Sequence, residues 1–192
     1  MHVEPVPAGT RAVVLVEGTS DRVAVETLAT GVGRDLAGEG VRVVAMGGAT
    51  NIGHFLDLLG PNGRGLRVAG LYDDAEEGFF RRGLERAGLG RGLTRPELAA
   101  LGFHACVADL EDELIRANGV DGVRRVVTEA GDLASFALFQ RQPAQQGRAV
   151  EAQLRRFLGT RSGRKAAYAR LLVTALDPDL APRSLRAVLD HL

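Results

Sequence analysis

Four short apolar runs, each followed by a turn signal and a helical pattern, constrain the fold of this chain more than any other feature. Residues 12–16 and 41–45 are rich in β-branched side chains, residues 67–72 and 103–107 are similar apolar runs, and all four have the length of buried strands. Alternation of strands and helices at this spacing predicts parallel βαβ units with right-handed crossovers. The predicted fold is therefore α/β, with a small doubly wound parallel sheet of four strands flanked by helices.

The sequence after the fourth strand has a helical pattern up to its last residues. Helices are expected near residues 109–118, 121–130, 132–140, 148–158, 164–176 and 183–191. Residues 88–102 predict an inserted loop with a short helical turn, and the Gln/Pro/Gly stretch 140–147 predicts a hinge. We expect two units, an α/β domain in residues 1–119 and an all-helical, basic extension in residues 120–192.

Charge is distributed unevenly along a chain whose net charge is zero. Residues 1–119 carry 12 basic and 17 acidic side chains, whereas residues 120–192 carry 12 basic and 7 acidic ones. Such a chain can hold cations in one place and a polyanion in another, although solvated helix faces are an alternative explanation. With no membrane-length apolar run and no signal-peptide pattern, we expect a cytoplasmic protein without membrane association. The single cysteine, Cys106, excludes a disulfide framework and a cysteine zinc cluster.

Acidic side chains follow three of the four predicted strands. They are Glu17 and Asp21 after the first strand, Asp73 and Asp74 after the third, and Asp109 and Glu111 after the fourth. Because the carboxyl ends of parallel strands meet at one edge of a sheet, we expect these acids to lie together. Crowded carboxylates repel one another unless cations neutralise them, and oxygen ligands without His or Cys suit Mg²⁺ or Mn²⁺. Capping of the helix that follows is the alternative role for Asp21 and Asp109.

Two further stretches are candidates for contact with phosphate. Gly47 and Gly48 lie in the turn after the second strand, where backbone N–H groups can approach a phosphate; a plain turn fits equally well. Basic side chains gather around the helix expected from residue 164, namely Arg155, Arg156, Arg161, Arg164 and Lys165, the only lysine of the sequence. They can neutralise a phosphate or follow a nucleic-acid backbone, or they can be ordinary solubilising surface.

Taken together, these stretches resemble a Toprim domain, the metal-binding catalytic module of topoisomerases, bacterial primases and OLD-family (overcoming lysogenization defect) nucleases. The similarity covers roughly residues 11–118 and rests on VLVEGTSD (14–21), MGGATNIGHF (46–55) and LYDDAEEG (71–78). The EGxSD pattern, the glycine pair and the later DLEDEL are most similar to the OLD-family version. The stretch GTRSGRKAAYARLL (159–172) matches the late helix that follows a basic residue in that family.

The resemblance implies a metal-dependent nuclease acting on nucleic acid, with DNA as the preferred substrate. It implies that Glu17 and Asp73 act at the reacting phosphate and that Lys165 stabilises developing phosphate charge. The metal ligands that it implies for Mg²⁺ or Mn²⁺ are Glu17, Asp21, Asp73 and Asp74, supported by Asp109 and Glu111. OLD-family nucleases usually carry an ABC-type ATPase ahead of their Toprim domain. Because this sequence has no Walker motif, any ATPase would have to be a separate partner protein.

One position departs from the family pattern. The aspartate motif is usually Asp-x-Asp, but here Asp73 is followed by Asp74 and Ala75. Asp74, Glu76 or Glu77 would have to supply the missing oxygen ligand. Two alternatives to a DNA nuclease therefore stay open: a catalytically degenerate Toprim module that binds nucleic acid or a partner protein, and an RNA-processing Toprim nuclease.

Overall fold

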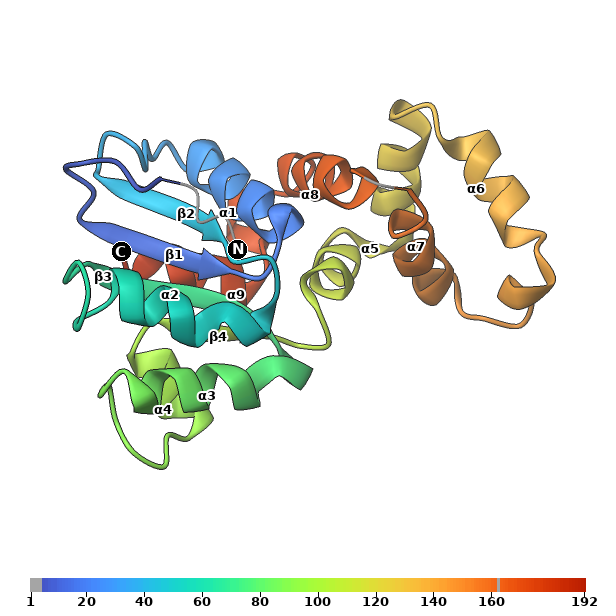
Figure 1. Ribbon diagram of the computed structural model, residues 1–192. Helices are drawn as coiled ribbons and strands as arrows, with labels where there is room; N and C mark the ends of the chain where they lie inside the picture. Colours follow the sequence, from blue (N-terminus) through green and yellow to red (C-terminus); the bar gives the residue numbers. More distant parts are fainter. Residues whose placement is uncertain (1–4, 162) are drawn as a thin grey trace.

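The computed structural model describes residues 5–161 and 163–192. Residues 1–4 of the predicted first unit and Ser162 in the basic stretch therefore lie outside the described residues. Four parallel strands form one sheet in the order β2-β1-β3-β4 (Figure 1). The strands are β1 (Ala12–Val16), β2 (Val41–Ala45), β3 (Arg67–Asp73) and β4 (Phe103–Cys106). The predicted fold class is confirmed, and each strand ends within one residue of its expected bounds.

The sheet is built around β1, whose five residues are all buried. It pairs with β2 on one edge and β3 on the other, so its backbone groups are satisfied on both sides. The register sets Val16 opposite Ala45 and Asp73 opposite Cys106. Leu15 is opposite Gly70, so β3 extends two residues beyond the end of β1, and the residues that follow the strands lie at one edge of the sheet.

Helices cover both faces of the sheet. The short 3-10 helices and helices of this domain are α1 (Thr19–Gly31), η1 (Ala49–Asn51), α2 (Ile52–Leu59), η2 (Asp74–Glu76), α3 (Glu77–Arg86), α4 (Arg95–Ala100) and α9 (Arg183–Asp190). Val14 and Val16 pack into the same buried cluster as residues of α1 and α9. Val13 and Leu15 point to the other face, into a cluster with residues of α2, α3 and α4. The alternation of β1 side chains thus divides the core into two layers, as a doubly wound sheet requires.

A helical lobe stands beside the carboxyl ends of the strands, where the arrowheads point in Figure 1. It contains α5 (Leu110–Glu129), α6 (Leu133–Gln140), η3 (Pro143–Gln145), α7 (Val150–Leu158), α8 (Arg164–Thr174) and η4 (Pro178–Leu180). Gly119 interrupts α5 with φ 65° and ψ 163°, a left-handed backbone that favours glycine. This kink coincides with the predicted boundary after residue 119, although the division into two units stays a prediction. Among the described residues, no helix is long and apolar enough to cross a membrane.

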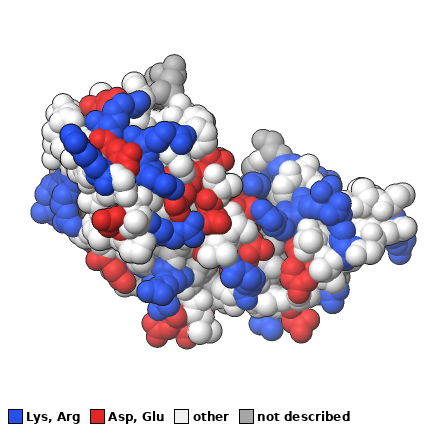
Figure 2. All heavy atoms as spheres, turned by 90° about the horizontal axis from the view of Figure 1, so that it is seen from below, with Lys and Arg blue, Asp and Glu red and all other residues white. Residues whose placement is uncertain are grey.

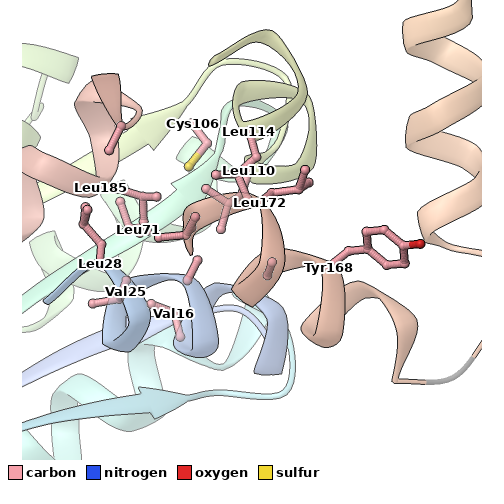
Figure 3. Close-up of a cluster of buried hydrophobic side chains, with 14 of the residues drawn as sticks. Val16, Val25, Leu28, Leu71, Cys106, Leu110, Leu114, Tyr168, Leu172 and Leu185 are labelled. Carbon is pink, nitrogen blue, oxygen red and sulfur yellow. The ribbon is translucent and has the colours of Figure 1, made fainter. Parts of the chain in front are cut away.

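The end of the chain returns from the lobe to the sheet. α8 packs along α1, and α9 packs against β3 and β4. Leu185 and Val188 of α9 are fully buried. Figure 3 shows Leu172 and Leu185 beside Leu28 and Leu71 in one apolar cluster. Because α8 is held against α1 in this way, the residues at its start have a fixed position relative to the edge of the sheet.

Candidate functional site

Glu17 follows β1 directly, and its backbone is held by the glycine turn after β2. The N–H groups of Gly47 and Gly48 donate to the Glu17 carbonyl oxygen at 3.0 and 3.1 Å. Both glycines have positive φ (71° and 130°), so the turn depends on their lack of a Cβ. The two N–H groups therefore fix the backbone of Glu17. Contact of the turn with a phosphate stays a prediction.

Asp21 lies in the first turn of α1 and caps it. Its Oδ2 accepts a hydrogen bond from the Gly18 N–H at 2.7 Å, which is the capping role that the sequence left open. The pKa of Asp21 is raised to about 6, mainly by burial and also by the negative charges of Glu111 and Glu17, against the lowering effect of the Gly18 bond. Asp21 is therefore both a structural cap and a member of the acidic group at the sheet edge.

Asp73, the last residue of β3, is the most perturbed of these acids. Burial raises its pKa to about 7, helped by the surrounding carboxylates, first Asp21 and then Glu17. Glu17 also has a raised pKa, mainly because it is partly buried. Within the described part of the chain, neither Asp73 nor Glu17 has a hydrogen-bonded or ion-paired side-chain partner. The charges of Asp21, Glu17, Asp109 and Glu111 all raise the pKa of Asp73, so acids from three βα junctions influence one another electrostatically, as expected.

The residues after Asp73 separate into two groups. The Asp74 carboxylate pairs with Arg95 of α4, and Glu77 accepts from Arg95 Nε at 2.6 Å. Ala75 is exposed. Glu76 is the charged group that raises the pKa of Glu17 most, which places it in the field of the acidic edge. Of the three acids that could replace the missing aspartate, Asp74 and Glu77 thus pair with Arg95 of α4. Glu76 is the one that can contribute an oxygen ligand beside Glu17.

Asp109 and Glu111, at the start of α5, are each paired with a base from the helical lobe. Asp109 Oδ1 accepts the Asp112 N–H at 2.8 Å, and its Oδ2 accepts Arg155 Nε at 2.8 Å. Glu111 is only 8% exposed, and its Oε1 lies 3.2 Å from Lys165 Nζ. Both predicted supporting ligands therefore connect the edge of the sheet to α7 and α8.

Arg164, although adjacent to Lys165 in sequence, lies inside the lobe. It is 8% exposed, donates to Thr160 Oγ1 at 2.7 Å and to Asp132 Oδ1 at 3.3 Å, and stacks its guanidinium on a phenylalanine ring. Tyr168 adds a hydrogen bond to Asp132 Oδ2 at 3.0 Å. Arg164 is therefore an anchor of the first turn of α8, and it is not on the surface where the sequence placed a nucleic-acid contact.

A cleft of about 350 Å³ lies between the start of α5 and the helices α7 and α8. It is lined by Asp109, Glu111, Arg148, Ala152, Arg155, Arg156 and Lys165. Figure 2 shows acidic side chains at the junction of the two lobes, with basic side chains on the helical lobe beside them. Three of the predicted basic residues, Arg155, Arg156 and Lys165, thus share one cleft. Arg161 is exposed but does not line it.

The fit of this site to a metal ion can be judged from its donors. Over residues 5–161 and 163–192, no three acidic, His or Cys side chains lie close enough together to hold a metal. Mg²⁺, however, usually keeps several waters and binds through one or two carboxylates together with substrate phosphates. Glu17 and Asp73, which have raised pKa values and lack partners in the described structure, suit such a site.

The sequence did not reveal what positions the junction between β4 and α5. Glu113 accepts the Val107 N–H at 2.8 Å and also accepts from Ser184 Oγ of α9. Ala108, which follows Val107 at this junction, has φ 66°, the only positive φ at a non-glycine residue in the described structure. The DLEDEL stretch was the one available signal, because its acids outnumber those that helix capping needs.

The chain thus has a four-stranded parallel sheet of order β2-β1-β3-β4, with acids from three βα junctions near its carboxyl edge, as the resemblance to a Toprim domain implies. Residues 10–74 match the family model described as "Overcoming lysogenization defect protein-like, TOPRIM domain". The resemblance to an OLD-like Toprim domain that was drawn from the motifs is therefore confirmed. Such a domain indicates a nuclease-type function.

Solved structures extend the similarity to most of the chain. The C-terminal region of the Burkholderia pseudomallei OLD protein has the same fold, with 22% identity, a TM-score of 0.69, and coverage of 95% of this chain and 96% of that one. The C-terminal region of the Xanthomonas campestris pv. campestris OLD protein is 25% identical, with a TM-score of 0.70 and coverage of 95% and 91%. A search of curated proteins found no match.

Proposed function

We propose that this protein is a Mg²⁺- or Mn²⁺-dependent phosphodiesterase that cleaves DNA. The observation that carries the proposal is the state of Asp73, whose pKa of about 7 reflects burial among other carboxylates without a compensating cation. Such a site is costly for folding, and clusters of perturbed groups at the carboxyl edge of an α/β sheet are typical of functional sites. The OLD-like Toprim match supports a nuclease over other phosphate chemistry.

The proposal assigns each acidic side chain a role. Glu17 and Asp73 would hold the metal ion, and Glu76 would supply the oxygen that the family's second aspartate provides, since Asp74 is paired with Arg95. When bound, the ion polarises the phosphate and activates water. Asp21 keeps the turn after Glu17 in place through its bond to the Gly18 N–H.

The basic wall of the cleft supplies the complementary charge. Lys165 Nζ, which pairs with Glu111 in the free protein, would turn to the phosphate oxygens and offset the charge that develops on them. Its raised pKa, due to Glu111 and the neighbouring acids acting against burial, keeps it protonated at neutral pH. Asp109 and Glu111 would then orient Arg155 and Lys165 as supporting groups, in addition to or instead of binding metal.

A second candidate is a non-catalytic Toprim module that binds nucleic acid or a partner protein, such as a separate ATPase. Two observations favour it. Ala75 stands where the family has its second aspartate, and Asp74, the neighbouring acid, is neutralised by Arg95. In this case the acidic edge would bind a single cation weakly, and the basic cleft would carry the function.

Nicking of supercoiled plasmid separates these candidates. We would compare wild type, Glu17→Gln and Glu129→Gln, an exposed acid at the end of α5, in Mg²⁺, in Mn²⁺ and in EDTA. We expect metal-dependent nicking by wild type and Glu129→Gln, and a loss of at least about a hundredfold in Glu17→Gln. Absence of metal-dependent cleavage of both DNA and structured RNA would favour the binding module. Cleavage of RNA alone would keep the chemistry and change the substrate.

A further inference from the structure

The bases that line the cleft are not equivalent. Arg155 pairs with Asp109, and Lys165 lies 3.2 Å from Glu111, so each has an acid of its own. Arg148 and Arg156 have no acidic partner among the residues that the structure describes. Arg148 uses only its Nε, which donates to the Ala144 carbonyl at 2.8 Å. The cleft therefore presents two guanidinium groups whose charge the protein does not neutralise.

These two arginines line the same cleft, together with a small residue that lies between them in sequence. Ala152 and Arg156 belong to α7, Arg148 lies just before the start of this helix, and all three are exposed. The methyl group of Ala152 leaves open the space that a longer side chain would occupy. A planar guanidinium group can donate two parallel N–H hydrogen bonds to the oxygens of one phosphate. It does so best when no carboxylate of the protein competes for these donors.

We propose that Arg148 and Arg156 bind a phosphodiester group of the nucleic-acid strand, one that flanks the phosphate at the acidic edge. The identity of the polyanion rests on the proposed function, whereas the binding site itself rests on the cleft. Asp109 and Glu111 also line the cleft and repel phosphate, so a strand in the cleft is drawn toward Arg148 and Arg156. Arg155 and Arg164 hold carboxylates of the protein and position the lobe.

The proposal is tested by the affinity for a fluorescently labelled oligonucleotide duplex, measured by anisotropy in EDTA so that no cleavage occurs. Arg148→Ala and Arg156→Ala are compared with Arg141→Ala, which removes an exposed arginine of the same lobe outside the cleft. We expect each cleft variant to bind severalfold more weakly and to lower the salt slope, d log K/d log[salt], by roughly 0.9. Arg141→Ala should keep the wild-type slope. Arg156→Ala keeps the test valid if loss of the Arg148 bond to Ala144 disturbs folding.

A charge-neutral pair of variants tests the space between the arginines. Ala152→Leu fills the cleft without changing its charge, and Ala137→Leu makes the same change at an exposed position of α6. We expect weaker duplex binding for Ala152→Leu only. Leucine is a good helix former, so both variants should fold like the wild type, as circular dichroism would check.

Several results would overturn the inference. These are equal salt slopes for the cleft variants and Arg141→Ala, no binding of DNA or RNA by the wild type, or displacement of the duplex by millimolar inorganic phosphate at constant ionic strength. The last result would indicate a site for small phosphate ions. Since binding is measured without metal, loss of nicking in Glu17→Gln together with full binding by the arginine variants would leave the proposed function standing and remove this inference alone.

Discussion

The charge on Asp73 should destabilise the metal-free protein, and the structure gives the size of the effect. In the unfolded chain this carboxyl has an ordinary aspartate pKa, whereas in the folded protein its pKa is about 7. Above both values the folded state holds a charge that it disfavours. A shift of about three pKa units corresponds to about 4 kcal/mol, at about 1.4 kcal/mol per unit. Because Asp73 is only partly buried, screening by water reduces this to about 2 kcal/mol.

The sign of the pH dependence follows from proton binding. Between the unfolded and the folded pKa, the folded protein keeps a proton that the unfolded chain has lost, so stability falls as pH rises through this range. The full cost is present above about pH 7, and it disappears near pH 4. Asp73→Asn, which keeps the shape and removes the charge, should therefore be more stable than wild type at about pH 8.

The assay is thermal unfolding in EDTA across this pH range, with Asp121→Asn, an exposed acid of α5, as control. For a chain of this length, about 2 kcal/mol raises Tm by roughly 4–8 °C at about pH 8. The difference should shrink steadily toward about pH 4, while Asp121→Asn stays close to wild type throughout. An Asp73→Asn variant that is less stable than wild type at high pH, or stabilised equally at all pH values, would refute the electrostatic reasoning.

The other predictions concern the metal, the buried arginine and the strained alanine. Mg²⁺ should raise the Tm of wild type more at about pH 8 than at about pH 6, because protons compete with the ion for Asp73. It should not raise the Tm of Asp73→Asn, and scanning calorimetry with and without Mg²⁺ checks both expectations. Arg164→Ala should cost about 3 kcal/mol in urea unfolding because it removes the cationic partner of Asp132 and leaves only the Tyr168 hydrogen bond, whereas Arg161→Ala, at an exposed position, should cost less than about 0.5 kcal/mol. Equal losses for the two variants would contradict the anchoring role. Ala108→Gly should stabilise the protein by about 0.5–1 kcal/mol in the same assay, since φ 66° strains alanine but not glycine; a loss of stability would contradict this.

The sheet could be predicted because its signals are local. Short apolar runs of strand length, each followed by a helical pattern, predicted all four strands within a residue. The position of α9 could not be predicted in this way. Its apolar positions, such as Leu185 and Val188, indicate that one side of the helix is buried. They do not indicate that this side packs against β3 and β4. That contact joins parts of the chain far apart in sequence.

For the candidate site, the sequence likewise predicted which acids share the sheet edge, but it did not predict their ion-pair partners. The acids at the ends of β1 and β3 had to meet, because parallel strands place their carboxyl ends at one edge. Their pairings depended on distant segments: Asp74 is held by Arg95 from the inserted segment, and Asp109 by Arg155 of α7. Arg164 and Lys165 are adjacent basic residues at the start of α8, and the sequence does not distinguish them. In the structure, Arg164 points inward to Asp132.

The central claim, a metal-dependent phosphodiesterase that acts through Glu17, is tested most directly by the nicking of supercoiled plasmid. Wild type and Glu17→Gln, purified in parallel, would be incubated with the same plasmid in Mn²⁺ and in EDTA. We predict nicking by wild type in Mn²⁺ and none by the variant or in EDTA. Equal cleavage by both proteins, or cleavage that persists in EDTA, would contradict the claim.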